Sequence, residues 1–458
     1  MILGHALPLG NTFFALLAGV SPAAHTLFLA RFVLACVLPK RRLTATLIAS
    51  CMAGHKRHRS NVVRFLRHLP PSIAADWLEA LFGNLLRGEP LDGAWLFLLD
   101  QTYCGHQSSR LENSYSTAHR GRRKTEENKD KRKKRKQQKQ SYCHCFVMGL
   151  LLTPHGVRLP VWLPYYTKEY CAEYGRQYRT QPQIAALLID QLRVPQDARV
   201  VVVGDTTFDA EPILAACGRR QFKWVVPMNY DRRLSGSEPR VQIQSLAGKY
   251  TAEQYVPIRL TPGQGPYVAQ RRAAACRVGP KAKTRTYWVH EERCDVHNVG
   301  KARVLFSTSK EIVKGQPVKV QKILLSNDLE RGIEDVIEIY DLRWQIELFF
   351  KELKSVFGLA DYVFKGFREI EGWVNGCLLT FMYLEWYRLQ MLEQTKDSPV
   401  ERERWRRQRS HGLALAVQQD VQREDIRVML EMSQTPEGLA QLQQLLREAL
   451  PKEFRKAG

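Results

Sequence analysis

Short, continuous apolar runs constrain the fold more than any other feature of this sequence. Two of them end at an acid, because Asp100 follows the first run and Gly204-Asp205 follows the last. The runs cover residues 94–99, 141–152 with a continuation through 157–163, and 198–203. Continuous apolar runs with polar ends are typical of central strands covered on both faces of a sheet. With a helical pattern over residues 176–192, they predict a mixed α/β core.

The sequence on either side of this core differs in texture. Residues 1–92 show helical periodicity, in segments at 23–38, 43–53, 60–68 and 73–87. Residues 221–325 look mainly β, with strands expected at 222–226, 255–260, 266–272, 285–290 and 303–307 between Gly, Pro and Ser turns. A helix is expected from Glu371 to Leu392, and the tail from Lys396 is charged and helical in pattern. At 458 residues, two to four domains are expected.

The charge of the chain points to a polyanionic partner. Its net charge is +23 and its pI is about 9.7, which favours nucleic acid, with an anionic membrane surface as the competing partner. The run from Arg120 to Lys139 holds twelve Lys or Arg against three acids. Sequence-independent phosphate binding is the natural interpretation of this run, and a solvated loop is the alternative. Basic residues also stud the helical region 1–92, which suits a DNA-binding domain or a plain helical cap.

Cysteine usage and the breaks in the apolar N-terminal segment argue against two other classes of protein. Ten Cys without dense, even spacing indicate a reduced, intracellular chain rather than a disulfide scaffold. Zinc binding by Cys104-x-His106 with Cys143-His144-Cys145 is the alternative to buried thiols, although these spacings are not those of common zinc motifs. Residues 1–30 carry no charge, but Gly10-Asn11 and Ser21-Pro22 interrupt them, so a packed helix is favoured over a membrane span.

A charged stripe follows the β-rich region. No Gly or Pro lies between Ile333 and Lys354, so these residues are expected to form one helix. At about 100° per residue, Tyr340, Arg343, Glu347 and Lys354 share one narrow face. A lone acid among phosphate-binding groups suits a metal ligand whose cationic neighbours hold nucleic acid. The alternative is an amphipathic helix with scattered surface charges.

This spacing, Tyr-x2-Arg-x3-Glu-x6-Lys, resembles the motif of the DDE transposases of bacterial insertion sequences, of the insertion sequence four type. The resemblance covers about residues 93–395. It implies a ribonuclease-H-like mixed-sheet catalytic core, formed by residues 93–220 and 326–395. The core would carry an inserted β-rich domain at 221–325, a helical N-terminal DNA-binding domain at 1–92 and a charged helical C-terminal region at 396–458.

The resemblance also implies the catalytic residues. Asp100, Asp205 and Glu347 would be the three acids that hold two Mg²⁺ ions, with Mn²⁺ able to substitute. Asp209 is a rival to Asp205, which is preferred because it ends the strand directly. Members of the family often carry a basic residue after the second Asp, and Thr206 stands here, which puts phosphate contacts at this turn in doubt.

Further residues are implied to contact DNA. Tyr340, Arg343, Lys351 and Lys354 would hold phosphates near the scissile bond, and Trp288 or Trp224 would stack on a flipped base of the transposon end, unless they are core residues. The basic run would add phosphate contacts from Lys131, Arg132, Lys133, Lys134, Arg135 and Lys136.

The function that the resemblance implies is metal-dependent cleavage of DNA at the ends of an insertion sequence, followed by transfer of the 3′-OH ends into target DNA. A hairpin intermediate can intervene. The protein would act as a homodimer on double-stranded transposon ends and target DNA, in the bacterial cytoplasm at the nucleoid and without a membrane partner. The alternatives are a catalytically inactive DNA-binding protein of the same fold, a nuclease without strand transfer, and a membrane-associated basic protein.

Overall fold

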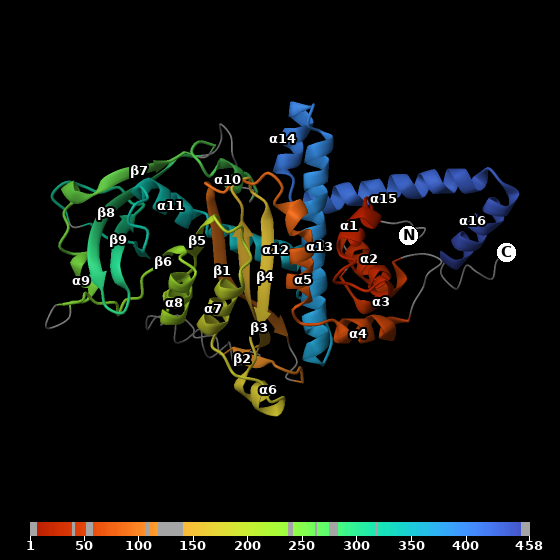
Figure 1. Cartoon of the computed structure of the whole chain (residues 1–458), viewed down its shortest axis with the longest axis horizontal. Coiled ribbons are helices and arrows are strands. Elements are labelled where there is room, and N and C mark those ends of the chain that lie inside the picture. The colour runs from red at the N-terminus through yellow and green to blue at the C-terminus, as the bar shows by residue number, and fades with distance from the viewer. Residues whose placement is uncertain are drawn as a thin grey trace, which may run out of the picture.

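One ten-stranded sheet runs through the molecule, with helices on both sides (Figure 1). The computed structural model describes residues 7–38, 42–51, 58–106, 110–117, 141–236, 241–261, 263–273, 283–316 and 318–449. The strand order is β2-β3-β1-β5-β6-β10-β9-β8-β7, and β4 pairs with β3 outside this path. The strands are β1 Ala94–His106, β2 Tyr115–Thr117, β3 Ser141–Leu152, β4 Arg158–Pro164, β5 Arg199–Val203, β6 Lys223–Pro227, β7 Val256–Leu260, β8 Arg285–Val296, β9 Gly300–Thr308 and β10 Lys322–Ser326.

The centre of the sheet confirms the mixed α/β class expected from the apolar runs. β1 pairs in parallel with β5 and antiparallel with β3, and β5 pairs in parallel with β6. The expectation that the first strand ends at Asp100 is wrong, because β1 continues to His106. The reason is its partner: β3 is long enough to pair with β1 from Leu96↔Leu152 to His106↔Tyr142, so the polar half of β1 also has its backbone hydrogen bonds satisfied.

The β-rich segment continues the same sheet beyond β6. β10 pairs antiparallel with β6, and β9, β8 and β7 follow outward in turn. The strand expected at residues 266–272 is wrong, because Val268–Ala273 forms helix α10. Tyr267, Gln270 and Arg271 are all buried, and this i, i+3, i+4 spacing places them on one helical face. The four other strands expected in this segment are confirmed, as β6, β7, β8 and β9.

Helices cover the sheet, and α13 forms the centre of the helical half (Figure 1). α7 contacts β3 and β4, while α12 contacts β1. The helices are α1 Gly10–Leu16, α2 Ala23–Val37, α3 Ala45–Ser50, α4 Arg59–His68, α5 Ile73–Leu85, α6 Lys168–Glu173, α7 Gln181–Gln191, α8 Glu211–Arg219, α9 Ile243–Leu246, α10 Val268–Ala273, α11 Ile333–Asp341, α12 Trp344–Ser355, α13 Phe367–Gln394, α14 Pro399–Arg407, α15 Ser410–Ser433 and α16 Pro436–Ala449, with 3-10 helices η3 Thr206–Phe208 and η4 Ala252–Gln254.

The N-terminal helices pack directly on α13. Two glycines of α13 permit this close approach: a Cβ at Gly372 would lie 2.2 Å from the Leu66 carbonyl oxygen of α4, and one at Gly376 would lie 2.6 Å from the Phe32 ring of α2. Side chains from α2, α4, α5 and α13 belong to one continuous apolar core that also includes the strands. A separate DNA-binding domain at 1–92 therefore stays a prediction, and these helices share their core with the rest of the protein.

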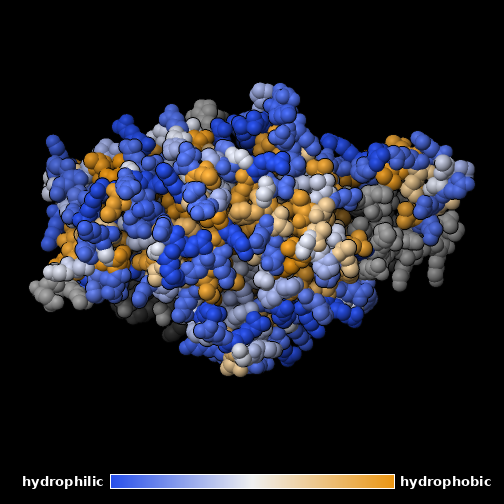
Figure 2. All heavy atoms as spheres, viewed as in Figure 1, coloured by the Kyte–Doolittle hydropathy of each residue, from blue (hydrophilic) through white to orange (hydrophobic). Residues whose placement is uncertain are grey.

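The surface is largely hydrophilic on the face drawn in Figure 2, where apolar residues are interspersed with polar and charged ones. Among the described residues, no helix is both long enough and apolar enough to cross a membrane. The nine cysteines that the structure describes are free thiols, and eight of them are buried.

Candidate active site

Asp100 lies within β1, and Asp205 lies just beyond the end of the parallel neighbouring strand β5. The last paired residues of β1 and β5 are Leu98 and Val203, and each Asp lies two residues further along its strand direction. Asp205 caps η3 and accepts a hydrogen bond from the Thr207 N–H over 2.8 Å. Asp100 accepts one from the Gln101 N–H over 2.8 Å. The carboxyl ends of two neighbouring strands thus bring together two acids that are about a hundred residues apart in sequence.

Glu347 comes from α12, which contacts β1. The expectation of a single helix from Ile333 to Lys354 is wrong, because a turn at Leu342 and Arg343 separates α11 from α12. The backbone of both turn residues keeps helical dihedral angles, and the Leu342 N–H is shared between the Glu338 and Ile339 carbonyl oxygens. The turn therefore tightens the helical path without reversing it.

Arg343 connects the helix to the first acid. Its guanidinium donates to the Glu347 carboxylate, with Nη2 2.7 Å from Oε1, and its Nη1 lies 3.8 Å from Oδ2 of Asp100. Burial, and then the negative charge of Asp205, raise the pKa of Asp100 from 3.8 to about 6. The Gln101 amide and Arg343 oppose this rise, and Glu347 adds to it. Asp100 therefore senses the charges of both other acids, as expected for carboxylates that share one site.

The three acids fit divalent metal by their chemistry. Carboxylate oxygens are the ligands that Mg²⁺ prefers, and two strands and a helix hold these carboxylates at one edge of the sheet. Within the described parts of the chain, no three His, Cys, Asp or Glu side chains are grouped tightly enough to hold a metal ion. Arg343 lies between two of the three acids in this arrangement.

The other residues of the Tyr340–Lys354 motif have partners of their own. Lys354 donates to the Tyr103 carbonyl oxygen over 2.9 Å, which ties α12 to β1. Lys351 is exposed on the same helix. The Tyr340 hydroxyl accepts a hydrogen bond from Lys322 Nζ over 3.0 Å, and the same ammonium lies 4.7 Å from the centre of the Tyr340 ring. Sequence reasoning missed Lys322, because only the pairing of β10 into the sheet brings it beside the motif.

A network of buried charges fixes α12 from its other side. Arg158 of β4 donates to Glu352 of α12 over 2.9 Å and to Glu385 of α13 over 2.5 Å. Arg388 also donates to Glu385, over 2.8 Å. Each cation is matched by a carboxylate, as buried charges require. The network holds α12 against α13 and β4, and so fixes the helix that carries Glu347.

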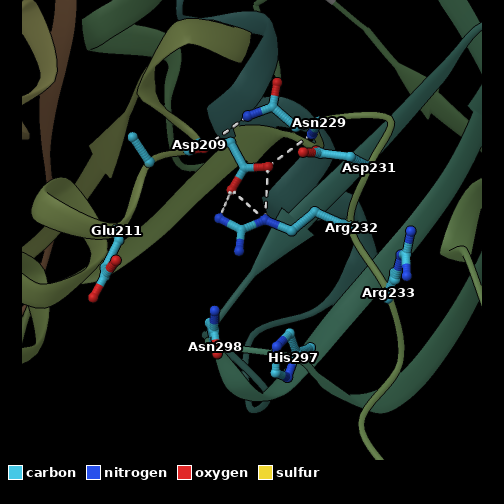
Figure 3. Close-up of a pocket in the computed structure, with 9 residues that line it drawn as sticks. Asp209, Glu211, Asn229, Asp231, Arg232, Arg233, His297 and Asn298 are labelled. Atoms are coloured by element: carbon cyan, nitrogen blue, oxygen red, sulfur yellow. Dashed lines mark hydrogen bonds and ion pairs between the residues drawn. The ribbon is translucent and has the colours of Figure 1, made fainter. Parts of the chain in front are cut away.

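The carboxylate of Asp209, the alternative to Asp205 as a catalytic acid, is already paired within the protein. Its side chain is completely buried, and both of its carboxylate oxygens accept hydrogen bonds from the Arg232 guanidinium. Asn229 donates to it through its backbone N–H over 2.7 Å. Figure 3 shows this pair at the centre of a polar pocket of about 480 Å³ that also carries Glu211, Asp231, Arg233, His297 and Asn298. The geometry favours Asp205, whose carboxylate is partly exposed and lies beside Asp100.

The tryptophans differ in how far their side chains are exposed, and so in whether they can stack on a base. Trp224 is 4% exposed within β6, which makes the expectation of a stacking role for it wrong. Trp288 on β8 is half-buried and packs against the core, so its stacking role stays a prediction. Sequence reasoning missed Trp344, which is 55% exposed directly after Arg343. The only feature of the sequence that could have indicated Trp344 is its position next to a residue of the charged stripe.

The basic run cannot be compared with the structure, because Lys131, Arg132, Lys133, Lys134, Arg135 and Lys136 lie outside the described residues. The neighbouring strands β2 and β3 pair antiparallel, and their last paired residues are Thr117 and Ser141. The described ends of this segment are therefore adjacent strand ends in the sheet.

Comparison with known proteins assigns the family. Residues 116–383 match the family model described as transposase DDE domain. This span contains Asp205 and Glu347 and begins after Asp100. No curated protein matches the chain. The mixed sheet flanked by helices is consistent with the ribonuclease-H-like fold of DDE transposases. Because the match extends over more than half of the sequence, this chain belongs to the DDE transposase family.

Proposed function

We propose that this transposase cleaves DNA at the ends of an insertion sequence and transfers the freed 3′-OH ends into target DNA. The observation that carries the proposal is that the charges of Asp205 and Glu347 both act on the Asp100 carboxylate, which lies beside the Arg343 guanidinium that also holds Glu347. In the first step, water attacks phosphorus and the P–O3′ bond breaks, which leaves a 3′-OH and a 5′-phosphate. In the second, the 3′-OH attacks a target phosphodiester and displaces its 3′ oxygen.

Asp100, Asp205 and Glu347 are the residues that would hold two Mg²⁺ ions, with Mn²⁺ as a substitute. When bound, such a pair stabilises the attacking and leaving oxygens of an in-line displacement at phosphorus. The chain supplies the rigidity: Asp100 stands within β1, Asp205 caps the 3-10 helix η3 directly after β5, and Glu347 stands on a helix anchored through Arg158 and Lys354. Rigid elements hold a reactive geometry better than loops do.

The cations around the acids would grip the phosphates near the cut. Arg343, Lys354 and Lys351 lie along α12, and Lys322 adds an exposed ammonium beside Tyr340. A guanidinium can bind phosphate through two parallel hydrogen bonds, whereas an ammonium acts as a point charge. These contacts would orient the scissile phosphate, and orientation supplies much of the rate in phosphoryl transfer.

The rest of the DNA affinity would come from outside this centre. The net charge of +23 far exceeds what the residues of α12 contribute. We assign the excess to the basic run at 120–139 and to the helical region 1–92, which together would bind the transposon end. Two copies of the chain would pair two ends, in the cytoplasm at the nucleoid, and Trp288 would stack on an unpaired base there.

The test is Mg²⁺-dependent nicking of a duplex that carries the inverted repeats flanking the coding region. Asp100→Asn, Asp205→Asn and Glu347→Gln should each abolish nicking and leave binding of the duplex largely intact. Glu393→Gln is the matched control, because this acid is 77% exposed on α13 and its ion-pair partner is Lys396 rather than a residue of the site. Near-normal nicking by any of the three variants would remove that residue from the site.

The same assay separates the alternatives. A target plasmid added to the reaction reports strand transfer as joined products. Nicking without joined products would indicate a nuclease. End binding without nicking by the unmodified protein would indicate an inactive DNA-binding protein.

A further inference from the structure

Arg343 occupies the space between two acids that would otherwise repel each other. Its Nη2 lies 2.7 Å from Oε1 of Glu347, and its Nη1 lies 3.8 Å from Oδ2 of Asp100. The Arg343 and Asp100 side chains are only 16% and 14% exposed, so water screens these charges weakly. The guanidinium thus provides the positive charge that this pair of carboxylates needs.

The same guanidinium can serve a different anion. Its planar fork of donors matches carboxylate and phosphate equally well, and it stays charged at every working pH. Arg343 is therefore able to exchange a carboxylate partner for a DNA phosphate without any change in protonation. Neither backbone nor helix has to move for this exchange, because only the long Arg343 side chain changes partner.

We propose that Arg343 is a positioning residue that keeps the acids closed to divalent metal until DNA arrives. DNA binding then transfers the Arg343 guanidinium from Glu347 and Asp100 to a phosphate, and the released carboxylates become available to metal. This inference rests on the proposed function of the three acids. Its consequence is positive coupling: DNA strengthens metal binding, and metal must strengthen DNA binding by the same factor.

Arg219 provides the matched comparison. Its guanidinium also pairs with a carboxylate, with Nη2 2.7 Å from Oδ2 of Asp190, but it ends α8, the helix that leads from the turn after Asp205 back to the start of β6. Removing Arg219 takes one positive charge from the protein and leaves the contact between Arg343 and the acids in place. A difference between the two variants therefore reports the position of Arg343 rather than the loss of charge.

The experiment measures Mn²⁺ binding to the DNA-free protein by electron paramagnetic resonance. Arg343→Ala should bind Mn²⁺ about tenfold more tightly than the unmodified protein, the factor expected when one hydrogen bond to a charged group no longer competes. Arg219→Ala should stay within about twofold of the unmodified protein. Arg343→Lys keeps the charge without the fork and should fall between them. Thermal denaturation of each variant checks that it is folded.

A second arm measures the coupling itself. A saturating short duplex of mixed sequence should tighten Mn²⁺ binding to the unmodified protein about tenfold, after subtraction of Mn²⁺ bound by the duplex alone. The same duplex should tighten binding to Arg343→Ala much less, because its acids are already open. Equal coupling in the two proteins would overturn the inference.

The outcomes separate this inference from the proposed function. If Asp100→Asn and Glu347→Gln lose Mn²⁺ binding while Arg343→Ala binds as the unmodified protein does, the acids hold metal and the inference about Arg343 is wrong. If Asp100→Asn and Glu347→Gln bind Mn²⁺ normally, the acids are not the metal site, and the proposed function falls together with the inference.

Discussion

Asparagine at Asp100 and at Asp209 should change stability in opposite directions, although both acids lie at the carboxyl edge of the sheet. The pKa of Asp100 rises from 3.8 to about 6, first because the group is buried and then because Asp205 is nearby. As pH increases above about 4, the unfolded chain gives up this proton before the folded protein does, so the folded state loses stability up to about pH 6. Above that pH the cost is fully present.

The rise in the Asp100 pKa corresponds to a cost of about 3 kcal/mol, which Asp100→Asn should remove at pH 8. The pKa of about 6 already includes the lowering by Arg343, so a stabilisation of up to about 3 kcal/mol is expected. Near pH 4 the folded protein keeps the Asp100 proton and the unfolded chain has lost it only in part, so the difference should fall below about 1 kcal/mol. Asp209→Asn should instead cost about 3–5 kcal/mol, because it breaks the ion pair of a fully buried carboxylate and leaves Arg232, which is 15% exposed, without its counter-ion.

The assay is urea denaturation of the three proteins at pH 8 and pH 4 in a chelating buffer, which keeps divalent ions from binding the acids. The midpoint of Asp100→Asn should lie clearly above that of the unmodified protein at pH 8 only, and that of Asp209→Asn should lie below it. Destabilisation by Asp100→Asn at pH 8 would refute the reasoning, since it would mean that this charge is compensated as well as the charge of Asp209.

Three further outcomes are expected. Replacing the six basic residues at 131–136 with Gln should weaken binding to all DNA sequences alike and flatten the slope of log K against log salt by up to about 5, as gel shifts at several salt concentrations would show. Burial lowers the pKa of His144 to about 4, so the unfolded chain takes up a proton before the folded protein does as pH falls below about 6.5. Up to about 3 kcal/mol of stability should therefore be lost between pH 6.5 and pH 4. Denaturation curves of His144→Gln should lack this loss. Lys322→Ala should slow single-turnover cleavage about tenfold or more at saturating DNA, because Tyr340 loses its ammonium partner and the site loses a phosphate contact; an unchanged rate would make Lys322 a bystander.

Local sequence pattern was sufficient to locate the central strands and to give the order of the acids. The apolar runs before Asp100 and Asp205 became β1 and β5, and their polar ends met at one edge. The composition of a strand is enough to identify it. An acid that follows the apolar run is then placed at the carboxyl end of that run. The long buried helix α13 was also expected, because its apolar pattern has no Gly or Pro signal strong enough to end it.

Contacts between distant segments were beyond the reach of that pattern. Nothing near Lys322 indicates that it will lie against Tyr340, and nothing near Arg158 indicates Glu352 as its partner. The strand expected at 266–272 failed for the same reason, since the burial of Gln270 and Arg271 against other elements decides that this segment is helical. The choice between Asp205 and Asp209 as the catalytic acid also depends on a distant contact, because Arg232 pairs with the Asp209 carboxylate.

The two ends of α12 are held in different ways, and this asymmetry suits a helix that must keep its position while one side chain changes partner. Toward its C-terminal end, Glu352 pairs with the buried Arg158, and Lys354 donates to a backbone carbonyl of β1. At its N-terminal end the contact with β1 is a longer ion pair between Arg343 and Asp100. Breaking the buried pair would strand a charge, whereas a phosphate that replaces Asp100 as the partner of Arg343 leaves the guanidinium paired. Binding of a phosphate by Arg343 would therefore release Glu347 and Asp100 without releasing the helix that places Glu347.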